Sequence, residues 1–426
     1  MSALPPPPPP PPPPTPHVRV GPISPSERQA SLDVLRGFAL LGILLVNVQL
    51  MAGPQLFEAL FVTTKAPVSL LEQVIGGLIG WLVAGKFIAS FSILFGVGAA
   101  IIAQRATVRG RAPVCLLLRR YVLLGLAGLA HMVLLFPGDV LFLYGVAGLV
   151  LLAFLHVSER TLTVWIVALL GVAAFMFTAF ALAEMNAVVD GATVALITDA
   201  LAEAKRAYAA GSYVGVVTWQ ALQALFIQSS SLLALPWTLA LFLIGMLAMR
   251  RGFALDPAKH RTQLVRIARL ALPLGLLVNL PLLFTGPVAE SAGSANVSVA
   301  LLMGASMADS VGAPLLAIGY LSALAVVVVD RGVTRGIYRR LAALGQIALT
   351  GYLSQSMLAL LVFFGLSRYG QVALFGESIL GMLVFVGGVW TVLLIFAPWW
   401  TARFRYGPFE WLWRWGTYGV RPRMRN

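Results

Sequence analysis

The stretch from residue 28 to residue 47 has the sequence Arg-Gln-Ala-Ser-Leu-Asp-Val-Leu-Arg-Gly-Phe-Ala-Leu-Leu-Gly-Ile-Leu-Leu-Val-Asn. From Leu32 onward it is apolar apart from Asp33, Arg36 and Asn47. A helix that crosses a lipid bilayer needs about 20 mostly apolar residues. This stretch therefore predicts a membrane-spanning helix with a few polar side chains along it.

The rest of the chain repeats this pattern. Of its 426 residues, 59% are hydrophobic and 11% are charged, and its mean hydropathy is +0.89. Soluble domains have about 25% charged residues. We therefore expect an all-α polytopic membrane helix bundle of about ten transmembrane helices, at roughly 32–52, 75–104, 118–136, 139–156, 162–184, 231–249, 268–286, 301–329, 341–366 and 376–398. Whether residues 68–86 belong to the second span stays open, because Lys86 interrupts the apolar run.

Composition and motifs exclude several classes of protein. A soluble two-domain enzyme is excluded by hydropathy, and a porin by the absence of alternating polar and apolar residues. A disulfide scaffold needs more than the single cysteine, Cys115. No phosphate-binding loop, zinc-type His/Glu pair or nucleophile elbow is present, so we expect neither a metal site nor a permanently bound cofactor.

The basic residues predict the orientation of the bundle. With ten spans and a cytoplasmic N-terminus, 24 of the Lys and Arg residues fall in inner segments and 4 in outer loops. This excess on the inner side predicts cytoplasmic termini and a multi-pass protein of the bacterial inner (cytoplasmic) membrane. The net charge of +14 lies in short loops between apolar runs rather than on one polar surface, so a nucleic-acid partner is excluded.

Three regions follow from composition. Residues 1–27 are a disordered Pro-rich tail, with ten prolines at 5–14 that form a polyproline rod, either as a docking site or without a partner. Residues 28–402 are the transmembrane helix bundle. Residues 403–426 alternate Arg with aromatic residues, which predicts a cytoplasmic amphipathic interfacial tail on membrane lipids. The longest outer loop, about 185–228, is predicted to be partly helical and is a candidate lid or contact with a periplasmic partner.

Polar residues within the first span are candidates for a site. At about 100° per residue, Asp33, Arg36 and Asn47 share one helix face, which must then face protein. Asp33 and Arg36 have a second interpretation, as a helix cap and its ion-pair partner at the inner surface.

The third span has His131 about five residues from its outer end, and Asp139 follows a short turn. A turn this short makes the two helices antiparallel neighbours, so the two side chains can approach each other. A carboxylate that orients an imidazole is the minimum for a general base. The alternative is a structural histidine beside a turn aspartate.

Four more residues complete the supporting polar cluster. Lys86 either extends its charge to the surface or neutralises a buried acid such as Asp139. Asp309 in the eighth span, and Ser354 and Gln355 in the ninth, are further candidates. Serine also joins helices by packing and hydrogen bonds, so this last signal has a structural interpretation as well.

Five separated motifs resemble the YeiB family of bacterial inner-membrane proteins. The first is the stretch at 28–47. The others, in order, are Lys-Phe-Ile-Ala-Ser-Phe-Ser-Ile-Leu-Phe-Gly-Val-Gly at 86–98, Gly-Leu-Ala-His at 128–131 with Gly-Asp-Val-Leu at 138–141, Leu-Thr-Gly-Tyr-Leu-Ser-Gln-Ser at 349–356, and Gly-Pro-Phe-Glu-Trp-Leu-Trp-Arg-Trp-Gly-Thr-Tyr-Gly at 407–419. The resemblance covers nearly everything from residue 28 onward, and it departs at Gly351, where an Asn is expected.

The first helix is also similar to that of membrane acyltransferases of the heparan-glucosaminide N-acetyltransferase type. That wider match covers Asp33, Arg36, Gly37 and Asn47. It implies transfer of an acyl group from a cytoplasmic thioester to an acceptor on the far side. The implied roles are His131 as base, Asp139 as its orienter, and Arg36, Arg119 and Arg120 as contacts to the phosphates of the donor.

The sequence therefore predicts two candidate functions. The first is acyl transfer from acyl-CoA, as a donor substrate, to a glycan or lipid acceptor. The alternative is a transporter or lipid-handling membrane protein, and a structural role or a homo-oligomer is also open. A continuous tunnel from the inner arginines to His131 favours acyl transfer, whereas a midplane site closed on one side favours a transporter.

Overall fold

The computed structural model describes residues 29–53, 69–110, 112–185, 191–209, 212–284, 299–334, 336–365 and 378–426. Within these ranges the chain is helical, and the one strand-like feature is an isolated bridge between Phe404 and Arg425. The Pro-rich tail at 1–27, Lys65, Arg111 and Arg368 lie outside the described residues. The prediction of an all-α polytopic helix bundle is confirmed.

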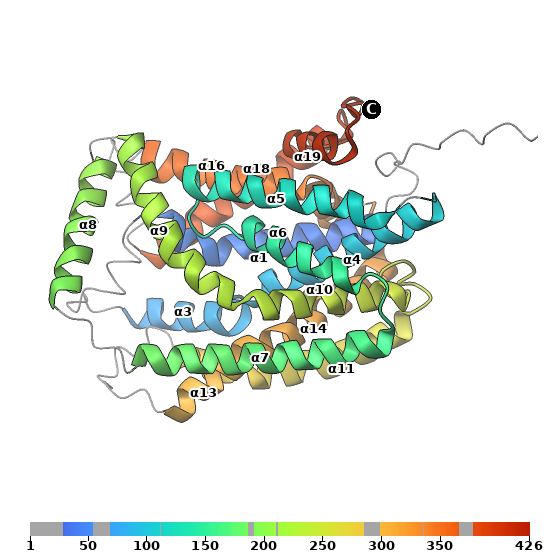
Figure 1. Cartoon of the computed structure of the whole chain (residues 1–426), viewed down its shortest axis with the longest axis horizontal. Helices are drawn as coiled ribbons and strands as arrows, with labels where there is room; N and C mark the ends of the chain where they lie inside the picture. The colour runs from blue at the N-terminus through green and yellow to red at the C-terminus, as the bar shows by residue number, and fades with distance from the viewer. Residues whose placement is uncertain are drawn as a thin grey trace, which may run out of the picture.

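The longest helices run side by side along the long axis of the molecule (Figure 1). They are long because apolar side chains occupy every face, so each buries surface against neighbours or lipid. In chain order the first half comprises α1 (Ala30–Met51), α3 (Leu70–Leu82), α4 (Lys86–Val108), α5 (Pro113–Leu134), α6 (Leu141–Leu151) with a 3₁₀ turn (Leu152–Phe154), α7 (Glu159–Met185), α8 (Gly191–Ala209) and α9 (Tyr213–Leu233).

The second half of the chain completes the bundle. It comprises α10 (Leu235–Arg250), α11 (Arg261–Val278) with a 3₁₀ turn (Leu280–Leu283), α13 (Val299–Met307), a π-helical turn (Ala308–Gly312), α14 (Ala313–Arg331), α15 (Gly336–Gln346), α16 (Ala348–Ala359), a second π-helical turn (Leu360–Gly365), α18 (Ile379–Thr401) and α19 (Pro408–Tyr418). α8 lies across one end of the bundle, and α19 lies near the other (Figure 1).

Fewer than ten helices of the described residues are long and apolar enough to be counted as membrane spans. Among the described residues, six helices are long and apolar enough to cross a membrane, and eight if each bent pair is one span. The two runs left over are α6, whose apolar helix covers only Leu141–Phe154, and α11, which begins with several arginines. Ten spans therefore stays a prediction. Residues 70–108 pass as one 39-residue span, with Lys86 near its middle.

The run at 341–366 differs most from its prediction as one helix. α15 and the helix that follows it meet at 88°, with the break at Ile347. Close packing explains this geometry, because a Cβ on Gly345 would lie 1.8 Å from the backbone oxygen of Asp33. Glycine alone permits this approach of α15 to α1. The turn then directs α16 away from α15.

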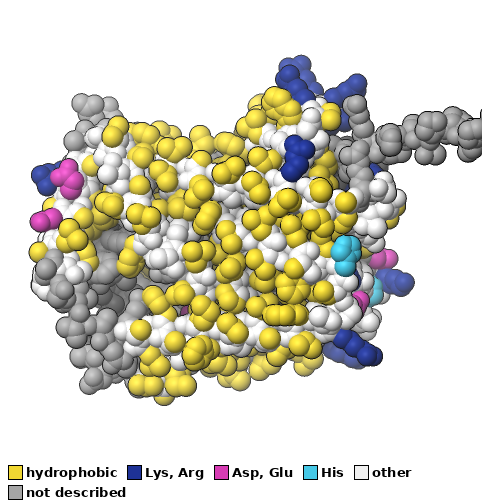
Figure 2. Space-filling model, viewed as in Figure 1, with side chains coloured by type: hydrophobic (Ala, Val, Ile, Leu, Met, Phe, Trp, Pro, Cys, Tyr) yellow, Lys and Arg dark blue, Asp and Glu magenta, His cyan; other side chains and the backbone are white. Residues whose placement is uncertain are grey.

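The two ends of the bundle are each joined by contacts that agree with the predicted sidedness. Segments predicted as inner are linked through Gln29 to Leu255, Arg251 to Glu159, and Arg261 to Asp330. At the other end, the Tyr213 hydroxyl donates to Leu134 O at 2.7 Å, and Gln228 Nε2 donates to Asp139 O at 3.0 Å. Hydrophobic side chains cover the middle of the face in Figure 2, and charged ones gather toward its ends. Which end faces the cytoplasm stays a prediction from charge.

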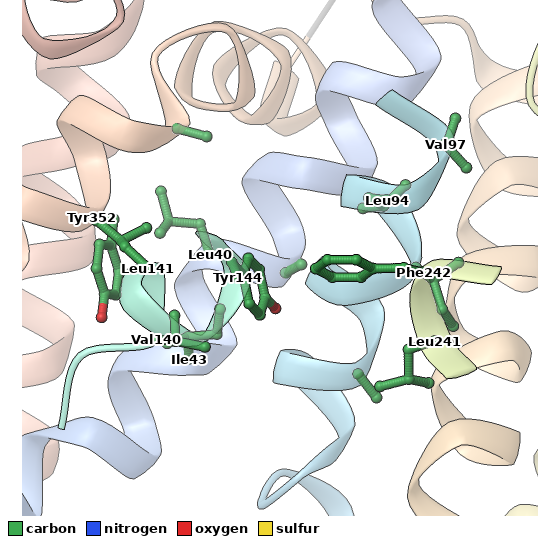
Figure 3. Close-up of a cluster of buried hydrophobic side chains, with 14 of the residues drawn as sticks. Leu40, Ile43, Leu94, Val97, Val140, Leu141, Tyr144, Leu241, Phe242 and Tyr352 are labelled. Atoms are coloured by element: carbon green, nitrogen blue, oxygen red, sulfur yellow. The ribbon is translucent and has the colours of Figure 1, made fainter. Parts of the chain in front are cut away.

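The core is a continuous layer of aliphatic and aromatic side chains between α1, α4, α6, α10 and α16. In Figure 3, Tyr352 lies beside Leu141, with Tyr144 and Phe242 further along the cluster. The Tyr144 and Phe242 rings meet edge to face, with centroids 5.2 Å apart. The buried Tyr144 hydroxyl is satisfied by the Ser92 hydroxyl at 2.6 Å. This layer holds α6 and α16 at fixed positions, and these two helices border the site.

Candidate functional site

His131 and Asp139 form the centre of the site. His131 lies in the last turn of α5, and Asp139 lies in the short turn before α6. His131 Nδ1 and Asp139 Oδ1 are 2.7 Å apart, and each residue is 3% exposed. The second carboxylate oxygen of Asp139 accepts from the backbone N–H of Phe142 at 2.9 Å, so it also caps α6. The sequence-predicted pair is thus brought together.

Local packing explains why these two helix ends approach so closely. A Cβ on Gly128 would lie 2.2 Å from the backbone nitrogen of Phe142, so only glycine fits on this face of α5. Gly128 is three residues before His131, on the same side of the helix. The spacing Gly-x-x-His thus lets α6 pack against α5 at the depth where the imidazole lies.

Ser356 on α16 extends the pair to a chain of three side chains. Its hydroxyl is 2.9 Å from His131 Nε2, and the residue is 1% exposed. With the Asp139 carboxylate accepting a hydrogen bond from Nδ1–H, Nε2 carries the lone pair and accepts a hydrogen bond from the Ser356 hydroxyl. The Tyr352 hydroxyl lies 3.5 Å from Asp139 Oδ1, and its ring centroid is 5.2 Å from that of His131.

This order of hydrogen bonds gives the histidine the chemistry of a base. A carboxylate that fixes the imidazole tautomer stabilises the imidazolium formed when Nε2 takes a proton. The hydroxyl at Nε2 is the group from which that proton would come. No group of three His, Cys, Asp or Glu side chains in the described part of the chain is arranged to hold a metal ion.

A cavity of about 200 Å³ leads from the end of the bundle that bears α19 toward the hydrogen-bonded side chains of Asp139, His131 and Ser356. Its mouth has four arginines, namely Arg36, Arg105, Arg120 and Arg414. Its deeper walls are apolar or aromatic and include Ile43, Leu141, Tyr144 and Tyr352. The lining ends at Val140, the residue after Asp139, and at Tyr352, whose ring packs against that of His131. Two carboxylates, those of Asp33 and Glu410, also line the cavity, so it combines an entrance with a net excess of arginine and an apolar interior.

The arginines predicted to contact donor phosphates differ in position. Arg36 and Arg120 line the cavity, and the Arg120 guanidinium lies 3.5 Å from the centroid of the Trp413 ring. Arg119 is exposed and donates to Gly416 O at 2.9 Å, so it ties α5 to α19 instead. The structure thus brings two of the three to the cavity.

The polar residues of α1 lie as follows. Asp33 is buried and pairs with Arg36 at 3.1 Å, and both line the cavity. Asn47 is half-buried further along α1 and is not part of the cavity lining.

On α16, Gln355 Nε2 donates to Leu40 O at 3.2 Å, which joins α16 to α1, and Ser354 is half-buried on another face.

Lys86 does not neutralise Asp139, which corrects that expectation. Its buried ammonium donates to Gly80 O at 2.8 Å, and the carboxylate that interacts with it electrostatically is that of Asp309. Asp309 lies in the π-helical turn before α14 and lines a separate groove of about 460 Å³ between α7 and α13. Asp139 already has His131 as its partner. The predicted cluster therefore divides into two places.

Several site residues were not selected from the sequence. Ser356 is the last residue of the motif at 349–356 and lies one helical turn after Tyr352. This spacing on one helix face is the sequence feature that could have pointed to it. Glu410 of α19 is buried and accepts from Leu349 N, Thr350 N and the Thr350 hydroxyl, so it caps the start of α16. Burial raises the pKa of Glu410 above its usual range, and these hydrogen bonds oppose that shift.

Fold and site together define a multi-pass membrane helix bundle with a buried Asp-His-Ser chain at the end of a cationic cavity. Residues 248–420 match the family model described as "Protein of unknown function (DUF418)". The chain is 30% identical to YxaH of Bacillus subtilis (strain 168), covering 93% of this chain and 96% of YxaH. It is 29% identical to YeiB of Escherichia coli (strain K12), covering 91% and 96%. The chain therefore belongs to the YeiB family of membrane proteins. No solved structure matches it.

Proposed function

We propose that this protein is a bacterial inner-membrane acyltransferase. Its donor is a cytoplasmic acyl thioester such as acyl-CoA, and its acceptor is a hydroxyl or amine of a glycan or lipid at the periplasmic side. The observation that supports this most is the hydrogen-bonded His131–Asp139 pair, 2.7 Å apart, at the closed end of a cavity with an arginine-lined mouth.

The chemistry of the cavity suits an acyl-CoA better than a neutral lipid. Phosphate groups are recognised by arginine because its planar guanidinium donates two parallel hydrogen bonds. Arg36, Arg105, Arg120 and Arg414 supply such donors at the mouth. The apolar deeper walls match a pantetheine arm and an acyl chain, whose burial is favoured by about 0.8 kcal/mol per CH₂ group. The thioester then lies at the end next to His131.

His131 has the position of a general base in this reaction. At Nε2 it takes the proton of the group that attacks the thioester, while Asp139 stabilises the resulting imidazolium. The released thiolate of the donor then takes a proton from the imidazolium. A positioned base contributes roughly 10²–10⁴-fold to such a rate.

Transport or lipid handling is the second candidate, and two observations favour it. The cavity lining ends at Tyr352 and does not include His131, so the cavity is closed on one side. Two helix pairs are bent, by 58° at α9–α10 and by 88° at α15–α16, and broken helices are common in transporters.

The test uses the purified full-length protein in lipid nanodiscs. Binding of acetyl-CoA and palmitoyl-CoA is measured at equilibrium, and release of CoA is followed by chromatography with and without hydroxyl and amine acceptors. We expect His131→Gln to lower CoA release by about 10²–10⁴-fold with unchanged unfolding. The matched control is His156→Gln, an exposed histidine, which should behave as the parent.

Two results would contradict the enzyme proposal. One is full CoA release in His131→Gln. The other is an absence of acyl-CoA binding by the parent for both chain lengths. If the parent instead moves labelled lipid or solute across vesicles without releasing CoA, the second candidate is supported.

A further inference from the structure

The position of Ser356 between two cavities is the starting observation. On α16, Leu349 and Tyr352 line the larger cavity, the one whose mouth has the arginines. One turn after Ser356, Ala359 and Leu360 line a second, smaller cavity nearer the opposite end of the bundle. Ser356 itself is 1% exposed and lines neither. Its hydroxyl is therefore part of the wall that separates the two.

The partners of Ser356 lie in the same wall. Leu124 on α5 lines the first cavity and Leu135, directly after the end of α5, lines the second, with His131 between them. In the turn before α6, Pro137 lines the second cavity and Val140 the first, with Asp139 between them. Three separate segments of the chain thus place one member each of the hydrogen-bonded chain at the boundary.

The second cavity is polar and about the size of one water molecule. Its volume is about 10 Å³, close to the roughly 10–15 Å³ that one water needs. Gln220 Oε1 and Gln223 Nε2 are buried at this cavity without a hydrogen-bond partner among the described residues. Buried amides without partners in native proteins usually bind water or a ligand. A water or an acceptor hydroxyl at this place would satisfy them.

We propose that Ser356 is a nucleophile that carries the acyl group as an ester from the first cavity to the second. This inference rests on the proposed acyl transfer and names how the transfer crosses the wall. In the first step, His131 Nε2 takes the hydroxyl proton, and Ser356 Oγ bonds to the thioester carbonyl carbon. The carbon–sulfur bond breaks, and the departing thiolate receives that proton from His131 and leaves as a thiol.

The second step returns the enzyme to its starting state. The acceptor hydroxyl or amine gives a proton to His131 Nε2, and its oxygen or nitrogen bonds to the ester carbonyl carbon. The carbon–oxygen bond to Ser356 breaks, and Ser356 Oγ regains the proton from His131. Donor and acceptor then never meet, so the kinetics are ping-pong and CoA release does not require an acceptor.

A different role for Ser356 makes the opposite prediction. If the serine only holds the His131 ring in place, the acceptor attacks the thioester directly. No acyl-enzyme then forms, and CoA release depends on the acceptor. The two roles are distinguished by whether an acyl group is found on the protein before any acceptor is added.

The experiment traps the acyl-enzyme on the full-length protein in nanodiscs. The background is Cys115→Ser, because Cys115 is exposed and would itself form a thioester. The protein is mixed with radiolabelled acetyl-CoA without acceptor and quenched in acid after a single turnover. CoA release and protein-bound label are then counted, and the labelled peptide is identified by mass spectrometry.

We expect a burst of one CoA per protein, with an acid-stable ester on the peptide that contains Ser356. Ser356→Ala should lose the burst and the label and lower turnover by about 10²-fold or more, while the variant remains folded with a cooperative melting curve. Ser322→Ala, which removes a buried serine hydroxyl from α14, should retain both.

Two outcomes would overturn the serine proposal while the acyltransferase proposal stands. One is undiminished turnover in Ser356→Ala, and the other is label on His131 or on no residue while acceptor-dependent CoA release continues. If the parent neither binds acetyl-CoA nor releases CoA with any acceptor, the acyltransferase proposal has failed together with its extension.

Discussion

Removing the Glu410 carboxylate should destabilise the start of α16. Its oxygens accept from Leu349 N at 2.6 Å, from Thr350 N at 3.0 Å and from the Thr350 hydroxyl at 2.6 Å. The residue is 7% exposed, so water replaces these bonds poorly in Glu410→Ala. Losing a helix cap costs about 0.5–2 kcal/mol, and orphaning buried donors costs about 1–3 kcal/mol. We expect a loss of about 2–4 kcal/mol in the free energy of unfolding.

The matched control is Glu72→Ala. Glu72 caps α3 from within its own first turn, where its carboxylate accepts from Ser69 in a partly exposed position. We expect this change to cost about 0.5–1 kcal/mol. Both are measured by unfolding in mixed micelles with a rising fraction of denaturing detergent. Equal losses for the two alanine variants would refute the interpretation of Glu410 as a buried cap.

The same glutamate gives a pH dependence of defined sign. Burial raises the pKa of the Glu410 carboxyl, so the folded state holds this proton more tightly than the unfolded state. The stability it contributes is fully present below the unfolded pKa, near 4.5, and is lost as pH rises through the folded pKa. Glu410→Gln keeps an acceptor and a donor but does not titrate. The parent should therefore lose stability relative to Glu410→Gln as pH rises, and a constant difference would contradict this.

Three further predictions concern the cavity and the topology. Tyr352→Phe, which removes the hydroxyl near Asp139, should lower the free energy of unfolding by about 1 kcal/mol. Tyr352→Ala should lower it by about 3–5 kcal/mol, because it leaves a void. Equal losses would contradict the packing role of the Tyr352 ring at the end of the cavity. Arg120→Gln should weaken acyl-CoA binding by about 10- to 100-fold, as measured by titration, and Arg119→Gln should not. Reporter fusions after Lys205 should be periplasmic and those after Arg335 cytoplasmic, and the reverse result would overturn the predicted orientation.

Hydropathy predicted the helices well because a helix that crosses a bilayer must consist of mostly apolar residues. Each of the ten predicted apolar runs contains a helix in the described residues. The break at Ile347 was not predictable from the run at 341–366, because its causes are distant in sequence. They are the contact of Gly345 with Asp33 and the cap from Glu410, some 60 residues further on.

The candidate site shows the same division between local and distant information. His131 and Asp139 were paired correctly because a short turn joins their helices, and the two residues are eight positions apart. Ser356 is 225 positions from His131, and a single sequence gives no signal over such a separation. The acid beside Lys86 was left open for the same reason, since its interaction with Asp309 depends on how α4 and α14 pack.

The most direct test of the acyltransferase account is a cryo-electron microscopy structure with a thioether analogue of acyl-CoA that cannot be cleaved. The account predicts density in the cavity, with the phosphates beside Arg36 and Arg120 and the thioether sulfur beside Tyr352 and His131. Density for the analogue outside the cavity, or a cavity filled by a lipid that the analogue does not displace, would contradict it.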